Sequence, residues 1–125
     1  MSAERICAYI NLDNAVKNME GFKSLINKDT KIMAVIKADG YGHGAVRIAN
    51  KLKDLPYLAG FAVATAEEAF ELRAAGIENP ILILGYTFKE DYEKLKAAAG
   101  ASVNGYIKAA INEKLEKDGH DFRIK

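Results

Sequence analysis

The chain has 125 residues, half of them hydrophobic, and its 18 Lys and Arg nearly balance its 17 Asp and Glu to a formal charge of +1. This length fits one modest globular domain, residues 1–125, and is too short for two ordinary domains. The charge balance argues against binding of nucleic acid or anionic membranes through net charge. The single cysteine, Cys7, excludes an intrachain disulfide framework. The sequence shows neither a signal-peptide pattern nor a long apolar run, which predicts a cytoplasmic protein.

The amino-terminal part predicts a strand, a helix and a second strand. A short strand is predicted over Arg5–Ile10. An amphipathic helix is predicted over Leu12–Ile26, where apolar residues recur at helical spacing. Lys31–Lys37 follows as an apolar strand. Both of its faces are apolar until Lys37, which is typical of a parallel strand covered on both sides.

Lys37 stands at the carboxyl end of this strand, where α/β folds place their chemistry. An amine held against apolar neighbours is partly desolvated, which frees its lone pair to condense with an aldehyde. The loop after it, Asp39–Gly44, contains three glycines, which let backbone approach a ligand closely and adopt positive φ. Tyr41 and His43 place polar tips beside this loop. These residues predict a reactive lysine beside a ligand-binding loop; a strand-end lysine that reaches for solvent is the simpler alternative.

Helix and strand signals alternate up to residue 99. Capping-box patterns, a hydroxyl followed three residues later by a glutamate, stand at Thr65–Glu68 and Thr87–Glu90 and predict helix starts. Glu67, Glu68 and Glu71 are interpreted as a cap and a solvated helix face, not as a catalytic carboxylate cluster. The predicted helices are His43–Leu52, Thr65–Gly76 and Thr87–Ala99, and the further predicted strands are Leu58–Ala64 and Ile81–Leu84. This order predicts an α/β fold with parallel strands.

Four segments carry a family resemblance. Ala34–Gly44, AVIKADGYGHG, closely resembles the cofactor-lysine motif of the alanine racemase family. Ala8–Ala15, Phe61–Ile77 and Pro80–Tyr86 resemble further segments of that family, in the family's order. The resemblance implies an α/β fold that is roughly half of a (β/α)8 (TIM-type) barrel, with helices outside. A complete barrel needs about 250 residues.

The resemblance also implies a chemistry. Lys37 would carry pyridoxal 5′-phosphate as an internal aldimine and serve as the catalytic base on its own face of an amino-acid substrate. Tyr41 would contact the cofactor phosphate; no direct role is expected for His43, and no metal is expected. The implied activity is that of an isomerase that interconverts L-alanine and D-alanine. The family's second acid/base would lie beyond Lys125, so this chain is expected to bind cofactor and to catalyse weakly or not at all.

A half-barrel leaves two open sheet edges and an uncovered apolar face, so a homodimer or larger oligomer is predicted. Two alternatives to a racemase remain open. The first is a non-catalytic module that holds pyridoxal phosphate. The second is a structural or DNA-binding remnant, because Lys89–Asp118 resembles the two helices of ribbon-helix-helix proteins. The basic strand of those proteins is not evident upstream, since Ile81–Tyr86 is apolar. Gly100–Gly105 is a poor strand sequence. Ile107, Ile111 and Leu115 then recur at helical spacing up to Gly119, and Phe122–Lys125 is a candidate for the start of a further strand.

Overall fold

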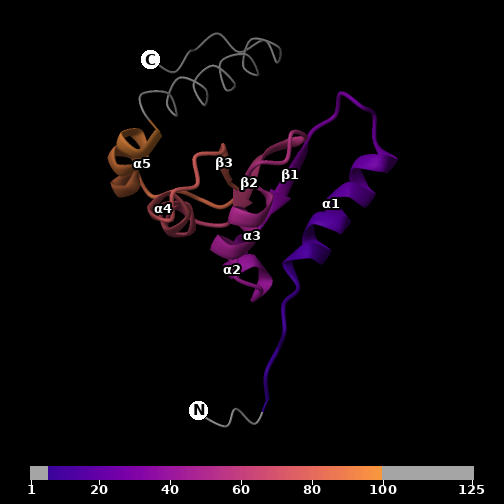
Figure 1. Ribbon diagram of the computed structural model, residues 1–125. Coiled ribbons are helices and arrows are strands. Elements are labelled where there is room, and N and C mark those ends of the chain that lie inside the picture. Colours follow the sequence, from indigo (N-terminus) through magenta and orange to yellow (C-terminus); the bar gives the residue numbers. More distant parts are fainter. Residues whose placement is uncertain (1–5, 100–125) are drawn as a thin grey trace. The chain divides into compact units, whose positions relative to one another are not determined.

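The computed structural model describes residues 6–99 and shows an α/β arrangement (Figure 1). Met1–Tyr86 and Thr87–Lys125 form two compact units. The described part of the first unit contains a parallel sheet of three strands in the order β1-β2-β3. Its strands are β1 (Ile32–Val35), β2 (Leu58–Val63) and β3 (Ile81–Ile83), and its helices are α1 (Leu12–Leu25), α2 (Lys37–Tyr41), α3 (Ala45–Leu52) and α4 (Ala66–Ala74). The predicted alternation of helices with parallel strands is confirmed.

Strand pairing fixes which side chains share a face of the sheet. Val35 lies opposite Ala62, and Ala62 lies opposite Leu82, so these three share one face. Val35 and Leu82 are 43% and 47% exposed, whereas Phe61 and Val63, on the other face, are fully buried. One face is therefore well covered, and the large side chains of the other are not. We call the second side, on which Met33, Val35 and Leu82 are exposed, the open face.

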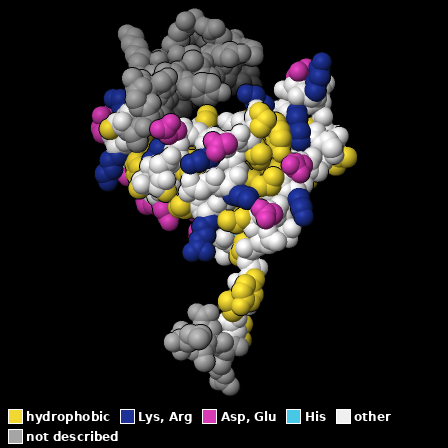
Figure 2. Space-filling model, in the orientation of Figure 1, with side chains coloured by type: hydrophobic (Ala, Val, Ile, Leu, Met, Phe, Trp, Pro, Cys, Tyr) yellow, Lys and Arg dark blue, Asp and Glu magenta, His cyan; other side chains and the backbone are white. Residues whose placement is uncertain are grey.

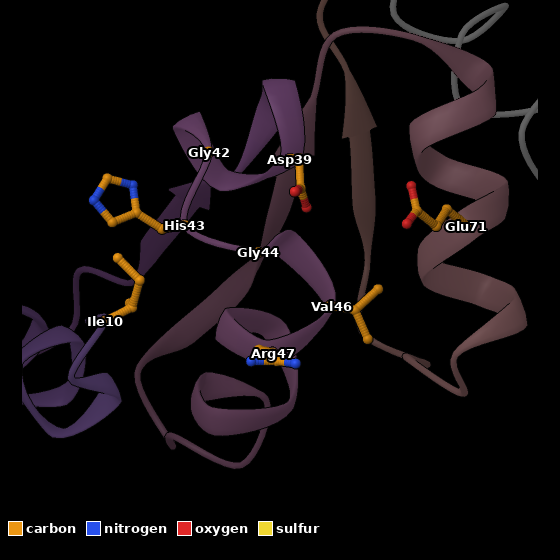
Figure 3. A pocket seen from close by; sticks show the side chains of 8 residues that line it. All are labelled: Ile10, Asp39, Gly42, His43, Gly44, Val46, Arg47 and Glu71. Carbon is orange, nitrogen blue, oxygen red and sulfur yellow. The ribbon is translucent and has the colours of Figure 1, made fainter. Parts of the chain in front are cut away.

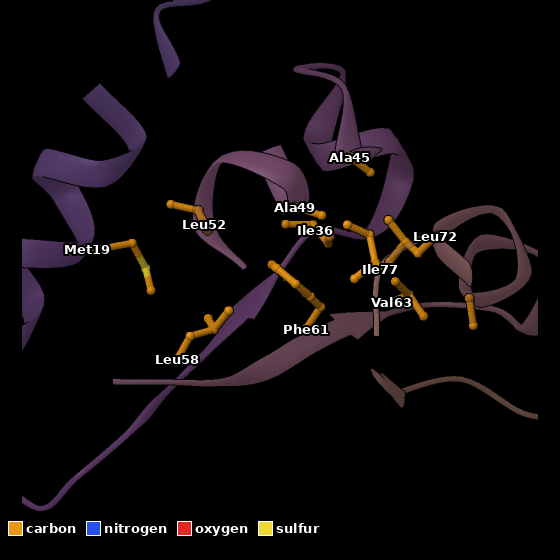
Figure 4. Close-up of a cluster of buried hydrophobic side chains, with 11 residues drawn as sticks. Met19, Ile36, Ala45, Ala49, Leu52, Leu58, Phe61, Val63, Leu72 and Ile77 are labelled. Atoms are coloured by element: carbon orange, nitrogen blue, oxygen red, sulfur yellow. The ribbon is translucent and has the colours of Figure 1, made fainter. Parts of the chain in front are cut away.

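The hydrophobic core lies between the covered face and helices α1, α3 and α4 (Figure 4). On α3, Ala45, Ala49 and Leu52 are buried and recur at the spacing that places them on one side of a helix. The small alanines let α3 lie close to the sheet. The buried cluster consists of Met19, Ile36, Ala45, Ala49, Leu52, Leu58, Phe61, Val63, Ala69, Leu72 and Ile77. The core thus fixes the strand that leads into Lys37.

Helix α1 begins where the sequence predicts it and packs along one edge of this core. Its N-cap, Asn11, accepts a hydrogen bond from the Asp13 N–H at 2.9 Å. Met19 is its buried residue. An ion pair of 2.7 Å between Lys51 Nζ and Asp13 Oδ1 ties α1 to α3. The contacts between these two helices are therefore partly apolar and partly ionic.

The strand predicted over Arg5–Ile10 is wrong for residues 6–10, which form an irregular segment outside the sheet. Ile6 and Tyr9 are 93% and 92% exposed, and Figure 2 shows hydrophobic side chains along this segment. The residues have strand-like composition, but the described part of the chain offers them no hydrogen-bonding neighbour. β1 also ends before Lys37, because the backbone turns into α2 there.

The described part of the second unit is a 3-10 turn, η1 (Lys89–Asp91), followed by α5 (Tyr92–Ala99). The N-cap of η1 is Phe88, which makes no side-chain capping bond, so the capping box predicted at Thr87–Glu90 is wrong. The expectations for Gly100–Gly105 and the rest of the chain lie outside the described residues, and one domain over residues 1–125 stays a prediction. Within residues 6–99, no helix is long and apolar enough to span a membrane.

Candidate cofactor-lysine site

Lys37 begins α2, a single turn whose backbone is left-handed. Ala38, Asp39 and Gly40 have φ/ψ of 51°/50°, 52°/46° and 62°/38°. Tyr41 has φ of 56°. A left-handed conformation costs about 1–2 kcal/mol for each residue that carries a Cβ. Such strain persists only where surrounding contacts hold it, and it often marks functional sites.

Hydrogen bonds close the turn in the pattern of an α-helix of opposite hand. The Gly40 N–H donates to Ile36 O at 2.8 Å, and the Gly42 N–H donates to Ala38 O at 3.0 Å. Both bonds link residue i to residue i−4. The N–H groups of Gly40 and Gly42 are thus paired within the segment and not with the sheet.

Two side chains of the glycine loop, those of Asp39 and His43, contact backbone groups of the same segment. Asp39 Oδ1 accepts a hydrogen bond from the Ala45 N–H at 2.8 Å, at the start of α3. His43 Nδ1 lies 3.1 Å from both Gly40 O and Tyr41 O. A ring nitrogen that donates to these carbonyls stabilises the end of the turn. These contacts are with backbone of the loop itself, and the expectation that His43 has no direct role in chemistry stays a prediction.

A third side chain reaches the turn from helix α4. Glu68 Oε1 accepts a hydrogen bond from the Ala38 N–H, and Glu68 Oε2 accepts one from the Ala64 N–H, each at 2.6 Å. The Glu68 N–H donates to Thr65 Oγ1 at 3.4 Å, so the predicted N-cap is confirmed. The carboxylate itself bonds backbone groups that follow β1 and β2.

The two predicted site residues, Lys37 and Tyr41, stand at opposite ends of α2. Lys37 is half-buried and follows the buried Ile36 directly, while Tyr41 is 59% exposed. The turn lies beyond the carboxyl end of β1, at the edge of the sheet where parallel α/β folds bind ligands. Lys37 and Tyr41 thus lie on one turn at this end of the sheet.

A pocket of about 410 Å³ lies beside the same loop but is lined by neither Lys37 nor Tyr41 (Figure 3). It combines the cation of Arg47 with the carboxylates of Asp39 and Glu71. The lining residues are Ile10, Asp39, Gly42, His43, Gly44, Val46, Arg47 and Glu71. Because its lining omits the lysine and its charge is mixed, this pocket is separate from the predicted lysine site. Among residues 6–99, no three His, Cys, Asp or Glu side chains gather as a metal site.

Sequence reasoning missed the role of Glu68. Its position three residues after Thr65 did signal a side chain that bonds backbone N–H groups near a helix start. The interpretation as a cap and a solvated face holds for the exposed Glu67 and Glu71. It misses that the half-buried Glu68 reaches the residue next to Lys37.

A parallel sheet with helices packed on its covered face is the arrangement of one segment of an α/β barrel, and Lys37 directly follows one of its strands. The family model described as "Alanine racemase, N-terminal domain" matches residues 10–120. The chain therefore belongs to the alanine racemase family, and the resemblance seen in the sequence is confirmed.

Sequence similarity to individual proteins agrees with this family. Alanine racemase 2 of Oceanobacillus iheyensis is 43% identical over 110 residues, covering 72% of this chain and 27% of the relative. Alanine racemase 2 of Bacillus subtilis is 39% identical over 118 residues, covering 92% of this chain and 29% of the relative. The chain thus spans between a quarter and a third of the length of these curated relatives.

Solved structures give the fold. Alanine racemase of Clostridium difficile 630 matches with a TM-score of 0.69 at 47% identity, covering 72% of this chain and 23% of that chain. Alanine racemase from E.faecalis matches with a TM-score of 0.66 at 37% identity, covering 71% of this chain and 24% of that chain. The predicted fold class, a partial (β/α)8 barrel, is confirmed.

Proposed function

We propose that Lys37 attaches pyridoxal 5′-phosphate through a Schiff-base linkage and that the chain is the cofactor-attaching part of an alanine racemase. The observation that carries this proposal is the position of Lys37. It stands on a strained left-handed turn directly after a buried strand, in a chain of this family. Its amine would condense with the cofactor aldehyde and release one water.

The residues around Lys37 suit this group. Lys37 is only half-buried, and Tyr41 is exposed, so its hydroxyl can donate to a phosphate oxygen. Such a cofactor, when bound, draws electrons from the substrate's α-carbon and makes its proton acidic. Lys37 would hold or move that proton on its own face of the substrate. Tyr41 would orient the group by its phosphate.

L-Alanine is the proposed substrate, since the matching family and relatives are alanine racemases. A matching structure from Bacillus anthracis, 31% identical with a TM-score of 0.66, is titled as having bound L-Ala-P. Because this chain covers only 26% of that protein, cofactor attachment is proposed for it first. As for catalysis, we propose that the chain interconverts L-alanine and D-alanine slowly or not at all.

Absorbance with added pyridoxal phosphate tests the attachment. The chain should develop the visible band of a Schiff base, which borohydride bleaches and fixes as added mass on the peptide that carries Lys37. Lys37→Ala should abolish the band. Lys31→Ala, which removes an exposed lysine just before the same strand, should retain it. A band of wild-type strength in Lys37→Ala rules the proposal out.

Exchange of the alanine α-proton in deuterated water then separates catalysis from storage. If Lys37 acts as a base on one face only, one enantiomer of alanine should exchange its α-proton for deuterium, without accumulation of the other enantiomer, so L-alanine and D-alanine are each tested. No exchange at all, together with a normal Schiff-base band, would leave the non-catalytic cofactor module as the function.

We also propose self-association through the open face. Met33, Val35 and Leu82 are 38%, 43% and 47% exposed there. Contiguous exposed apolar residues of this kind mark interaction surfaces. Light scattering at micromolar concentration should show a dimer or larger species. Leu82→Lys should lower the average mass of the species in solution toward that of the monomer. A sharp monomer of the unsubstituted chain would refute this.

A further inference from the structure

β1 and β2 stop pairing just before the left-handed turn. In a regular parallel ladder, the Ala64 N–H would next donate to Ile36 O, and the Ala38 N–H would then donate to Ala64 O. Both carbonyls have other donors. Ile36 O accepts from the Gly40 N–H at 2.8 Å, and Ala64 O accepts from the Gly85 N–H at 3.0 Å. The N–H groups of Ala38 and Ala64 are thus left without their ladder acceptors.

Glu68 replaces both acceptors with one carboxylate. Its Oε1 accepts from Ala38 and its Oε2 from Ala64, each at 2.6 Å. Distances this short are typical of hydrogen bonds to a charged group. The side chain is half-buried, and its own backbone is held at the start of α4 by Thr65. The carboxylate therefore spans the point where β1 and β2 separate.

We propose that Glu68 is a positioning residue for Lys37. Ala38 follows Lys37 directly, so a bond to the Ala38 N–H fixes the peptide group that joins the two residues. That peptide group sets the direction in which the Lys37 side chain leaves the backbone. Glu68 acts through the backbone and touches neither cofactor nor substrate. This inference rests on the proposed function of Lys37 as the cofactor-attaching amine.

The chemistry of the carboxylate dictates the test variants. In Glu68→Gln the new amide has one acceptor oxygen and one NH2 group, so one of the two backbone N–H groups would face another donor. This variant therefore breaks one bond with little change in volume. Glu68→Asp keeps the charge on a shorter side chain. Glu78→Gln removes the same charge from an exposed position after α4 and serves as the control.

The first measurement needs no cofactor. Amide hydrogen exchange in the 125-residue chain should be slow at Ala38 and Ala64. In Glu68→Gln it should be at least about tenfold faster at one of them, the equivalent of one lost charge-assisted hydrogen bond. Glu78→Gln should match the unsubstituted chain. Equal exchange at both amides in Glu68→Gln and the control would overturn the inference.

The second measurement reads out Lys37. Glu68→Gln should weaken Schiff-base formation with pyridoxal phosphate about tenfold, for the same reason. Glu68→Asp should recover part of the loss, and circular dichroism should show all variants folded at the assay temperature. If Glu68→Gln does not fold, Glu68→Asp carries the comparison. A variant that loses amide protection but binds the cofactor normally would limit Glu68 to a structural role and refute positioning.

The two proposals fail in distinguishable ways. Failure of the unsubstituted chain to form a Schiff base would refute the proposed function. The rate of methylation of Lys37 by formaldehyde and cyanoborohydride, which reduces the imine first formed, then replaces cofactor binding as the readout of the orientation of Lys37. A methylation rate in Glu68→Gln equal to that in Glu78→Gln would still refute positioning, and a change confined to Glu68→Gln would support it.

Discussion

Asp39 caps α3 from six residues away: its Oδ1 accepts the Ala45 N–H at 2.8 Å. The N-cap of α3 is Gly44, which makes no side-chain capping bond. Asp39 therefore accepts from one of the first-turn N–H groups, which a helix leaves without an acceptor of its own. Because Asp39 is itself left-handed, the strained turn after Lys37 and the start of α3 depend on each other.

This dependence predicts opposite effects for two similar substitutions. Ala38→Gly removes a left-handed strain of about 1–2 kcal/mol and adds unfolded-state entropy of about 0.5–1 kcal/mol, so it should stabilise the chain by about 0.5–1 kcal/mol. Asp39→Gly relieves the same strain but loses a charge-assisted bond of about 1.5–3 kcal/mol, so it should destabilise the chain. Urea denaturation measures both. Destabilisation by Ala38→Gly would show that the turn is not left-handed in solution.

Gly85 gives a second prediction, just after β3. A Cβ added at Gly85 would lie 2.4 Å from Ala64 O, which is backbone and cannot move aside. Gly85→Ala should therefore destabilise the chain by about 1–3 kcal/mol, the usual cost of overpacking. Gly21→Ala is the control, because nothing lies within 4 Å of its added Cβ in α1. In a helix interior it should stabilise the chain by about 0.5–1 kcal/mol. If Gly85→Ala and Gly21→Ala changed the free energy of unfolding in the same direction, this would contradict the geometry.

The left-handed turn also shows how far the sequence predicts this structure. Periodicity places α1, α3 and β2 within a few residues of their true ends, because those patterns are local. The hand of the turn was not predictable, since Ala38 and Tyr41 favour negative φ by themselves. Contacts from elsewhere hold them, above all the Glu68 bond to a residue 30 positions away. Lys37 stands out as a strand-end lysine before a glycine loop, whereas Glu68 follows a helix-cap pattern that carries no sign of its distant partner.

Lys23 gives a third prediction, for the loop between α1 and β1. Its Nζ donates to Asn27 O, Lys28 O and Thr30 O at 3.0, 2.7 and 2.7 Å, which uses all three ammonium donors. Lys23→Met keeps the stem and loses these bonds, so it should cost about 1 kcal/mol, since the freed carbonyls can bind water. It should also speed exchange of the Thr30 amide. Lys28→Met, which changes an exposed side chain, should do neither.

The ion pair between Asp13 and Lys51 predicts a pH dependence. The hydrogen bond and charge of Lys51 lower the pKa of Asp13 from its ordinary value of 3.8. Since the folded-state pKa is the lower one, the pair stabilises the fold fully above 3.8, and this stabilisation is lost as the pH falls through the lowered pKa. Asp13→Asn should therefore lower the melting temperature at neutral pH, and the difference should vanish in strong acid.

Lys51→Gln should reproduce both the loss at neutral pH and its disappearance in acid, because it removes the other half of the same pair. High salt should shrink both effects, as expected for exposed charges. Asp54→Asn, which changes an exposed carboxylate just after α3, is the matched control and should change the melting temperature little at any pH. If the Asp13→Asn effect is as large in strong acid as at neutral pH, then α1 is held to α3 by apolar packing at Met19 and its neighbours, and the ion pair contributes nothing.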